Sequence, residues 1–131
     1  MKLLLDTHIL LWWLNQDRKL SQTEMDMIAN PDRLVFVSAV TAWEIAIEKM
    51  IGKLEAPDDL PAALASNNFL ELPITILQGR GYANEHSQEL YRLPLHHHDP
   101  FDRMMVAQAM SEDLTLMTRD PKIALYDIRI I

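Results

Sequence analysis

Two aspartates follow apolar runs that have the length and composition of buried strands. Asp6 comes directly after Leu3–Leu5, and Asp120 comes just after Leu114–Thr118. The carboxyl ends of parallel strands meet at one edge of an open α/β sheet, and such sheets bind their ligands there. We therefore expect the carboxylates of Asp6 and Asp120 to lie near the same edge.

A third acid, Asp102, is expected in the first turn of a helix. Asp99-Pro100 is a favoured pair for the N-cap and first turn, so the helix is predicted to begin there and to run to about Glu112. A helix that follows a strand or its loop begins near the same edge of the sheet. Asp102 also stands three residues after Asp99, so helix capping is an alternative role for this pair.

The fourth acid, Glu44, lies on a helix predicted between Ser38 and Gly52. The apolar stripe of this helix has the i, i+3, i+4, i+7, i+8 spacing of one helix face and comprises Trp43, Ala46, Ile47, Met50 and Ile51. Successive residues are about 100° apart around a helix, so Glu44 is expected at the border of the stripe. A carboxylate on such a border can face a cleft.

Carboxylates that lie close together raise one another's pKa unless a cation neutralises them. The chain has no cysteine and no pair of histidines at helical metal-binding spacing, so oxygen ligands and a hard cation such as Mg²⁺ or Mn²⁺ are indicated. Such an ion polarises a phosphoryl group or activates a water molecule. Taken singly, each acid also fits a turn or a helix cap. The convergence of several acids at one edge is what favours a metal site.

Three consecutive histidines, His96, His97 and His98, stand directly before Asp99. Neighbouring side chains in an extended segment point to opposite faces, so three in a row cannot easily share one metal ion. We interpret them as part of a polar, loop-rich segment, Glu85–His98. A contact between one of them and a substrate remains an alternative.

Strand and helix patterns alternate along the 131 residues, without a linker or repeat. Strands are predicted at Leu3–Leu5, Leu34–Val37, Phe69–Leu72, Leu114–Thr118 and Ile128–Ile131. Further helices are predicted over Ile9–Leu14, from Ser21 to Asn30, from Asp58 or Asp59 to Asn67, and after Thr75. This alternation predicts a single three-layer α/β/α domain over residues 1–131, with a mostly parallel central sheet of four to five strands.

The formal net charge of −7 argues against a protein that coats nucleic acid nonspecifically, so any activity on nucleic acid must rest on a local site.

Asp6 and His8 interrupt the N-terminal apolar run, and no small-residue cleavage site follows. Neither a signal peptide nor a membrane span is therefore expected. The lack of cysteine is compatible with a reducing compartment. We expect a soluble cytoplasmic protein without a membrane partner.

The whole chain resembles PIN-domain proteins, specifically the VapC-like toxins of bacterial toxin–antitoxin pairs. LLLDTHILLWWL resembles the opening strand and helix of the family, and VSAVTAWEIAIEKMIGKL resembles its Glu-bearing helix. HHHDPFDRMMVAQAMSEDLTLMTRD resembles the stretch with its last two acids. The resemblance implies Asp6, Glu44 and Asp102 as the core acids and Asp120 as the fourth, at a position where Asp and Asn both occur. Asp99 is left as a helix cap.

The resemblance also implies an activity. The chain is expected to be a Mg²⁺- or Mn²⁺-dependent endoribonuclease in which the four acids bind metal and are catalytic. Its implied partners are an RNA substrate, a small antitoxin and a second copy of itself in a homodimer. Arg103, Arg119, Thr7 and Thr118 stand beside these acids and are the candidates for substrate binding. Surface arginines that pair with nearby acids are the alternative for Arg103 and Arg119.

Two other enzyme or signalling classes with strand-end acids do not fit the sequence. A phosphotransferase of the haloacid-dehalogenase type needs a strand that ends in Asp-x-Asp, and Asp6-Thr7-His8 lacks the second acid. A receiver-like phosphoacceptor domain needs an acidic pair and a late lysine at a strand end, which the chain lacks. Two alternatives stay open: a housekeeping PIN-type RNA-processing nuclease, and a non-catalytic binding module whose acids only cap helices.

Overall fold

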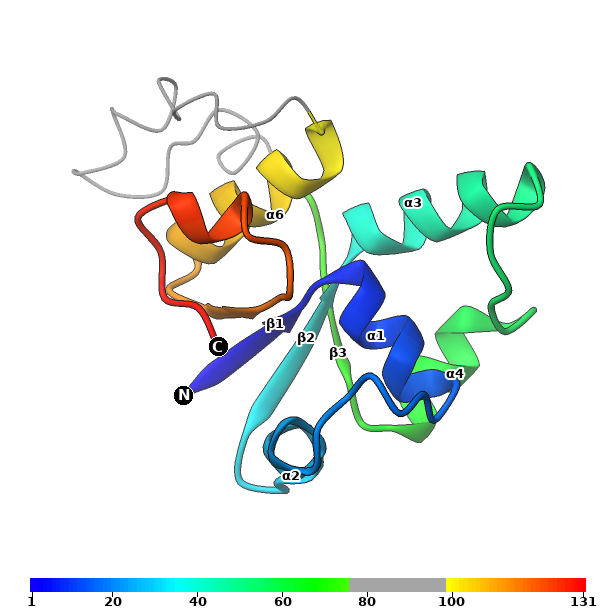
Figure 1. The fold of residues 1–131 in the computed structure, drawn as a ribbon, viewed down its shortest axis with the longest axis horizontal. Coiled ribbons are helices and arrows are strands. Elements are labelled where there is room, and N and C mark those ends of the chain that lie inside the picture. Colours follow the sequence, from blue (N-terminus) through cyan, green and yellow to red (C-terminus); the bar gives the residue numbers. More distant parts are fainter. Residues whose placement is uncertain (76–98) are drawn as a thin grey trace.

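The computed structural model describes residues 1–75 and 99–131 (Figure 1). Its strands are β1 (Lys2–Leu5), β2 (Leu34–Ser38), β3 (Leu70–Leu72) and β4 (Thr115–Met117). Its α-helices are α1 (Thr7–Leu14), α2 (Gln22–Ala29), α3 (Ala39–Met50), α4 (Leu60–Ser66) and α6 (Pro100–Ser111), and a short 3₁₀ helix, η2, spans Ile123–Leu125.

The four strands form one sheet in the order β3-β2-β1-β4, and every pair is parallel. On β1, Leu4 pairs with Phe36 of β2 on one side and with Leu116 of β4 on the other. From β1 the chain continues to β2 and β3 on one side, whereas β4 is added on the opposite side. The carboxyl ends of β1 and β4 therefore flank a topological switch point, where open α/β sheets bind ligands.

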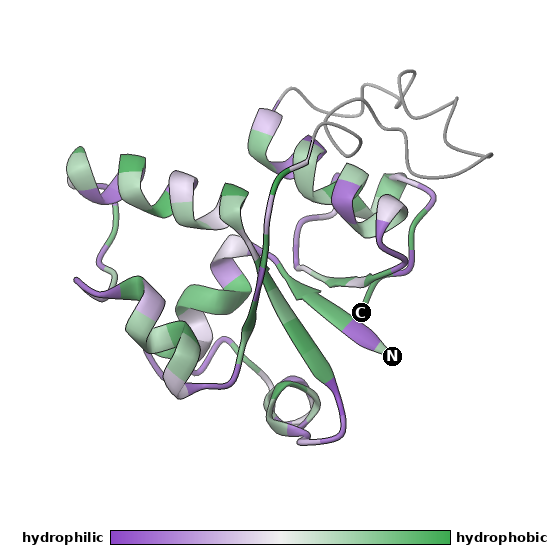
Figure 2. Cartoon of the chain, turned by 180° about the vertical axis from the view of Figure 1, so that it is seen from behind, coloured by the Kyte–Doolittle hydropathy of each residue, from purple (hydrophilic) through white to green (hydrophobic). Residues whose placement is uncertain are grey.

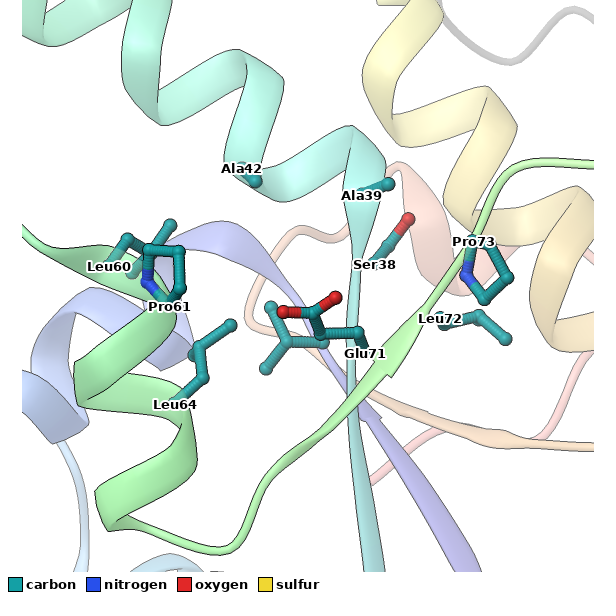
Figure 3. A pocket seen from close by; sticks show the side chains of 10 residues that line it. Ser38, Ala39, Ala42, Leu60, Pro61, Leu64, Glu71, Leu72 and Pro73 are labelled. Atoms are coloured by element: carbon teal, nitrogen blue, oxygen red, sulfur yellow. The ribbon is translucent and has the colours of Figure 1, made fainter.

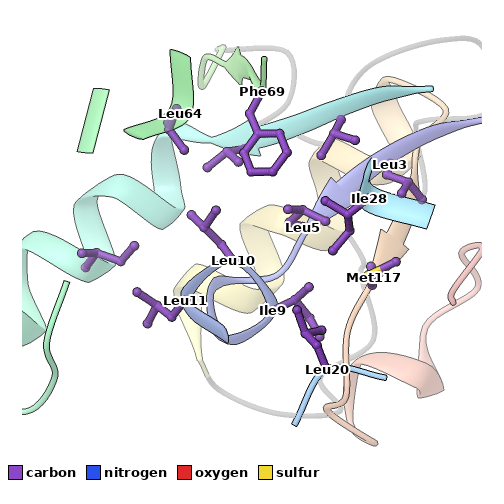
Figure 4. Close-up of a cluster of buried hydrophobic side chains, with 13 residues drawn as sticks. Leu3, Leu5, Ile9, Leu10, Leu11, Leu20, Ile28, Leu64, Phe69 and Met117 are labelled. Atoms are coloured by element: carbon purple, nitrogen blue, oxygen red, sulfur yellow. The ribbon is translucent and has the colours of Figure 1, made fainter. Parts of the chain in front are cut away.

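Hydrophobic cores on the two faces of the sheet make the three layers. Leu3 and Leu5 point into the core on the face covered by α1, α2 and α4 (Figure 4), whereas Leu4 points into the core beneath α6 and η2. This alternation follows from the twofold period of a strand. Apolar residues occupy most of each strand (Figure 2), as expected for a parallel sheet buried on both faces. The predicted fold class is confirmed.

Side-chain caps begin the helices where the sequence predicts. Ser21 caps α2 in a full capping box with Glu24, and Asp59 caps α4. Asp99 caps α6, with Pro100 at its first position. These caps satisfy backbone N–H groups that have no partner inside the helix. They also determine where each helix begins relative to the sheet edge.

The predicted last strand is present only as an isolated bridge. Ile130 pairs in parallel with Leu116, and the backbone nitrogen of Leu116 donates to the carbonyl of Arg129 at 2.9 Å. The chain thus runs alongside β4 without forming a regular strand. Before it, η2 forms where no helix was predicted, because Ile123 is fully buried against α6 and anchors this turn.

The apolar stripe predicted on α3 does not face the core. Trp43 is 60% exposed and Met50 is 79% exposed, whereas Val40, Thr41, Glu44 and Ile45 are buried. The periodicity identifies one apolar face, but it cannot determine which face packs on the sheet. Glu44 therefore lies on the buried face of α3 and not at the border of a buried stripe.

Some predictions fall outside the described residues. They are the helix after Thr75 and the polar segment Glu85–His98, which contains the three histidines. Within the described ranges, no helix has both the length and the apolar character needed to cross a membrane.

Candidate active site

One pocket at the carboxyl edge of the sheet is lined by acidic side chains. It has a volume of about 290 Å³ and lies outside the ends of β1 and β4, at the switch point. Its acidic lining residues, among those described, are Asp6, Glu44, Asp99, Asp102 and Asp120. The four acids singled out from the sequence thus share one pocket, together with a fifth. We call this space the acidic pocket.

Asp6 is held at the end of β1 by hydrogen bonds to both carboxylate oxygens. The Thr118 hydroxyl donates to Oδ2 at 2.6 Å, and the backbone nitrogen of His8 donates to Oδ1 at 2.8 Å. The second bond makes Asp6 the N-cap of α1, and the backbone nitrogen of Asp6 donates to the carbonyl of Met117 at 3.0 Å. Asp6 is only 5% exposed, so its carboxylate is fixed between β1 and β4.

Glu44 enters the pocket from the buried face of α3. The Thr7 hydroxyl donates to Oε1 at 2.6 Å and lies 3.2 Å from the Thr41 hydroxyl. Burial raises the pKa of Glu44, the Thr7 hydrogen bond opposes this shift, and the charges of Glu48, Asp99 and Asp6 add to the rise. The carboxylate is thus oriented by a hydroxyl, and no positive charge from the described residues is among the causes of its pKa shift.

Asp102, in the first turn of α6, is the most strongly perturbed acid. Burial and the negative charges of Asp99, Asp6, Glu44 and Asp120, in that order, raise its pKa from 3.8 to about 7. Burial disfavours the ionised form, and each nearby carboxylate disfavours it further. The acidic pocket therefore carries more negative charge than its surroundings neutralise.

Asp120 reaches the pocket from the turn after β4. Its backbone nitrogen donates to the Thr118 hydroxyl oxygen at 3.1 Å, and its Oδ1 accepts from the backbone nitrogen of Lys122 at 2.8 Å. Thr118 thus contacts both Asp6 and Asp120. The two threonines predicted to bind substrate, Thr7 and Thr118, are buried, and each donates its hydroxyl to a pocket carboxylate.

The two arginines predicted to bind substrate lie in different places. Arg119 lines the acidic pocket, and its guanidinium pairs with Glu24. Arg103 is not among the pocket-lining residues, and its Nη1 donates to the Tyr126 hydroxyl at 3.0 Å. Of these two arginines, Arg119 is the one that lines the acidic pocket.

The pocket also includes residues that sequence reasoning did not assign to it. The sequence predicts Asp99 only as a helix cap; its carboxylate does cap α6, but it also lines the pocket. His8 and Trp12 line it from α1. His8 is two residues after Asp6, and the i, i+4 spacing of His8 and Trp12 indicates that they share a helix face. The Asp6 carboxylate, whose Oδ1 lies 3.8 Å from Nδ1 of His8, raises the pKa of His8, and burial opposes the rise.

Two other pockets have a different character. One, of about 340 Å³, lies among α3, α4 and β3 and is mostly apolar, with Glu71 as its charged lining residue (Figure 3). The other, of about 630 Å³, lies beside the end of α1 and includes Trp12, Trp13 and Arg18. Among their described lining residues neither gathers several carboxylates, so the acidic pocket is the better candidate for phosphate chemistry.

The donors of the acidic pocket suit a hard divalent cation. They are carboxylate oxygens, which Mg²⁺ and Mn²⁺ prefer, and the raised pKa of Asp102 reflects a negative charge that such an ion would neutralise. Within residues 1–75 and 99–131, no three His, Asp or Glu side chains already form a metal-binding cluster. The donor chemistry fits a metal site, although the donors are not gathered around a centre.

Comparisons with known proteins agree with the fold. The family model of the PIN domain matches residues 3–129. A chain in the crystal structure of VapBC2 from Rickettsia felis bound to a DNA fragment from their promoter is 16% identical, with a TM-score of 0.68, over 100% of this chain and 98% of that chain. A chain in the structure of DNA-bound VapBC from Salmonella typhimurium is 21% identical, with a TM-score of 0.67, over 100% and 97%. No curated protein sequence matches.

Proposed function

Because this chain belongs to the PIN domain family, whose model spans residues 3–129, we propose that it is a metal-dependent endoribonuclease of the VapC-like toxin type. PIN domains are generally nucleases that use divalent metal ions. The observation that carries the proposal is the set of four acids, Asp6, Glu44, Asp102 and Asp120, that line one pocket at the switch point of the sheet. Each comes from a separate segment, so local helix capping does not account for their convergence.

In this proposal the four carboxylates hold Mg²⁺ or Mn²⁺. When bound, the ion supplies charge stabilisation at the phosphate and a lowered pKa for an attacking water. Thr118 and the backbone nitrogen of His8 orient Asp6, and Thr7 orients Glu44. Asp102, with a pKa of about 7, is partly protonated at neutral pH and must lose its proton to act as a ligand.

RNA binding must overcome the negative charge of both partners. The formal net charge of the chain is −7, and acids predominate in the pocket. Neutralisation of these acids by a divalent ion would remove the repulsion where the scissile phosphate lies. We therefore expect RNA affinity, as well as cleavage, to depend on divalent ions.

The decisive experiment compares variants that preserve shape but remove charge. Wild type, Asp6→Asn and Asp102→Asn are incubated with total RNA with and without Mg²⁺, and the cut ends are mapped. Loss of one preorganised charged group is expected to lower the cleavage rate by about a hundredfold or more. Asp32→Asn, at an exposed acid before β2, is the matched control and should cleave normally. Full activity of both pocket variants would refute the proposal.

A toxin and a housekeeping nuclease share this chemistry and differ in their partners. The similar solved structures are VapBC complexes with DNA, and this supports an antitoxin partner for the present chain. Expression in the bacterial cytoplasm should arrest growth for a toxin, and co-expression with the product of the neighbouring reading frame should restore it. Growth that the wild-type protein does not affect would favour the housekeeping nuclease.

The non-catalytic binding module makes the opposite prediction. If the acids only cap helices, the wild-type protein would not cleave RNA, and the pocket variants would therefore not change cleavage.

The proposed homodimer is a further part of the toxin hypothesis. The exposed apolar residues of α3, such as Trp43 and Met50, support it.

A further inference from the structure

Arg119 is held at the acidic pocket by contacts that converge from distant parts of the chain. Its Nε donates to Oε2 of Glu24 at 3.0 Å, and its Nη2 donates to Oε1 of the same carboxylate and, at 2.8 Å, to the carbonyl of Lys19. Its guanidinium carbon lies 5.5 Å from the ring centroid of Trp12. A bidentate ion pair and an aromatic face together fix both the position and the plane of the group.

Glu24 is itself immobilised. It is the third residue of α2 and completes the capping box with Ser21, whose backbone nitrogen donates to its Oε1 at 2.9 Å. Its side chain is only 13% exposed. Arg119 lowers the pKa of Glu24 through their hydrogen bond, so the pair is ionised at neutral pH. The start of α2 thus anchors a guanidinium that belongs to the turn after β4.

We propose that Glu24 and Trp12 are positioning residues that hold Arg119 at the rim of the acidic pocket as a preorganised contact for an RNA phosphate. This inference rests on the proposed ribonuclease function. Among the described residues that line the pocket, Arg119 is the only arginine or lysine. Its Nη1 makes no hydrogen bond within the described part of the chain, which leaves one edge of the guanidinium for a ligand.

The physical advantage is that less freedom is lost when RNA binds. A free arginine side chain loses rotamer entropy when it is fixed on a phosphate, whereas Arg119 is already fixed by Glu24 and Lys19. Glu24 reduces the net charge of the pair, but Arg119 lines the pocket whereas Glu24 is not among its lining residues. Arg119 therefore contributes mainly through geometry, and its effect depends on Glu24.

The first test measures RNA binding by protein that does not cleave. Asp6→Asn protein is titrated with a fluorescent single-stranded RNA in Mg²⁺ at several salt concentrations. Adding Arg119→Ala should weaken binding about tenfold. The plot of the logarithm of the binding constant against the logarithm of the salt concentration should become shallower by about 0.7, the value for one phosphate contact to a single strand. Arg129→Ala, which removes an arginine paired with Asp113 outside the pocket, should change neither quantity by a comparable amount.

The second test asks whether Glu24 and Trp12 act through Arg119. Glu24→Ala should weaken RNA binding when Arg119 is present and have no further effect in the Arg119→Ala protein, as a double-mutant cycle reveals. Trp12→Ala should behave in the same way, and Trp12→Phe, which keeps an aromatic face, should restore binding. Ser21→Ala disrupts the same capping box but keeps Glu24, so it controls for loosening of α2.

A third measurement does not depend on RNA. In the metal-free protein, the Arg119 Nε–H should exchange slowly with solvent by NMR and should exchange rapidly in Glu24→Ala. Rapid exchange in the wild type, or additive effects of Glu24→Ala and Arg119→Ala on RNA binding, would overturn this inference but not the proposed function. A wild-type protein that neither cleaves nor binds RNA would overturn the proposed function, and with it the phosphate contact.

Discussion

Two threonine hydroxyls orient the two most buried carboxylates of the acidic pocket. Thr118 donates to Asp6 and Thr7 donates to Glu44, each at 2.6 Å. Short hydrogen bonds to an ionised acceptor are among the stronger ones in proteins. These bonds also fix which lone pairs remain for a metal ion. Mutation of a group that orients a metal ligand typically lowers metal affinity or activity about ten- to hundredfold.

Replacement of Thr118 by valine tests this role. Valine keeps the shape but removes the hydroxyl, so Asp6 loses one of its two fixed contacts. We expect a ten- to hundredfold loss of Mn²⁺ affinity or of cleavage rate, measured by calorimetry and by RNA cleavage. Thr118→Ser retains the hydroxyl and should stay close to wild type. Equal metal affinity in the valine and serine variants would show that the hydroxyl does not tune the site.

The raised pKa of Asp102 makes the stability of the metal-free protein depend on pH. In the unfolded chain this carboxyl ionises near pH 3.8, and in the folded chain near pH 7. Between these values the folded state holds a proton that the unfolded state lacks, so the free energy of unfolding falls as the pH rises. Above about pH 8 the carboxyl is ionised in both the folded and the unfolded state, so it no longer changes the free energy of unfolding. The sign is opposite to that of a salt-bridged aspartate.

We expect thermal unfolding of the metal-free protein to occur at a lower temperature at pH 8 than at pH 5. Because Asp102 is only partly buried, solvent screening limits the effect to on the order of 1 kcal/mol. Asp102→Asn should remove most of this difference in unfolding temperature between pH 5 and pH 8. Millimolar Mg²⁺ should also reduce the difference, because it favours the ionised form of Asp102. A difference that Asp102→Asn leaves unchanged would mean that other groups cause it.

At the scale of elements, the start of α6 serves two purposes. The Oδ1 of Asp99 accepts from the backbone nitrogens of Phe101 and Asp102, at 2.9 and 3.2 Å, and so caps the helix. The same carboxylate is the nearby charge that most raises the pKa of Asp102, after burial. The cap stabilises α6, while its charge adds to the repulsion within the pocket.

Substitutions of Asp99 separate these two effects. Asp99→Ser can still cap the helix but has no charge, whereas Asp99→Ala has neither. We expect the alanine variant to be about 1 kcal/mol less stable than the serine variant in urea unfolding. Both should lower the pKa of Asp102, followed by the carboxyl carbon in NMR. If the serine and alanine variants are equally stable, the cap contributes nothing measurable.

At the scale of the whole molecule, the exposed apolar face of α3 is the feature that one copy of the chain does not explain. Met50 is 79% exposed and Ile51 is 57% exposed, and both lie at the end of α3 away from the acidic pocket. Large apolar patches on a surface often mark an interface between proteins. The proposed homodimer would cover this face, and an antitoxin is the alternative occupant.

A charge placed on this face tests the homodimer. The wild-type protein should have a mass in solution near twice the 15.1 kDa of one chain, measured by light scattering. Met50→Lys should shift the mass toward the monomer, because a lysine would be buried without a partner. Leu125→Lys, at an exposed apolar residue of η2, is the control and should not change the mass. A monomeric wild-type protein would contradict the homodimer.

Much of the architecture was determined by local sequence. Strand runs such as Leu3–Leu5 and caps such as Ser21 and Asp99 act within a few residues, so composition and spacing identify them. The parallel, two-sided sheet follows from their alternation, since parallel strands need crossover helices. The edge at which Asp6 and Asp120 meet was likewise predictable, because strand direction places both at the carboxyl ends.

Tertiary structure alone decided which groups surround those acids. Glu24 and Arg119 are 95 residues apart in sequence, and no local pattern pairs them. The face of α3 that packs inward, and with it the burial of Glu44, depends on which neighbours cover the helix. The pKa of Asp102 likewise depends on the distances to four acids from other elements or caps. Periodicity and capping are local properties of the chain, whereas burial and charge coupling exist only after distant segments have packed together.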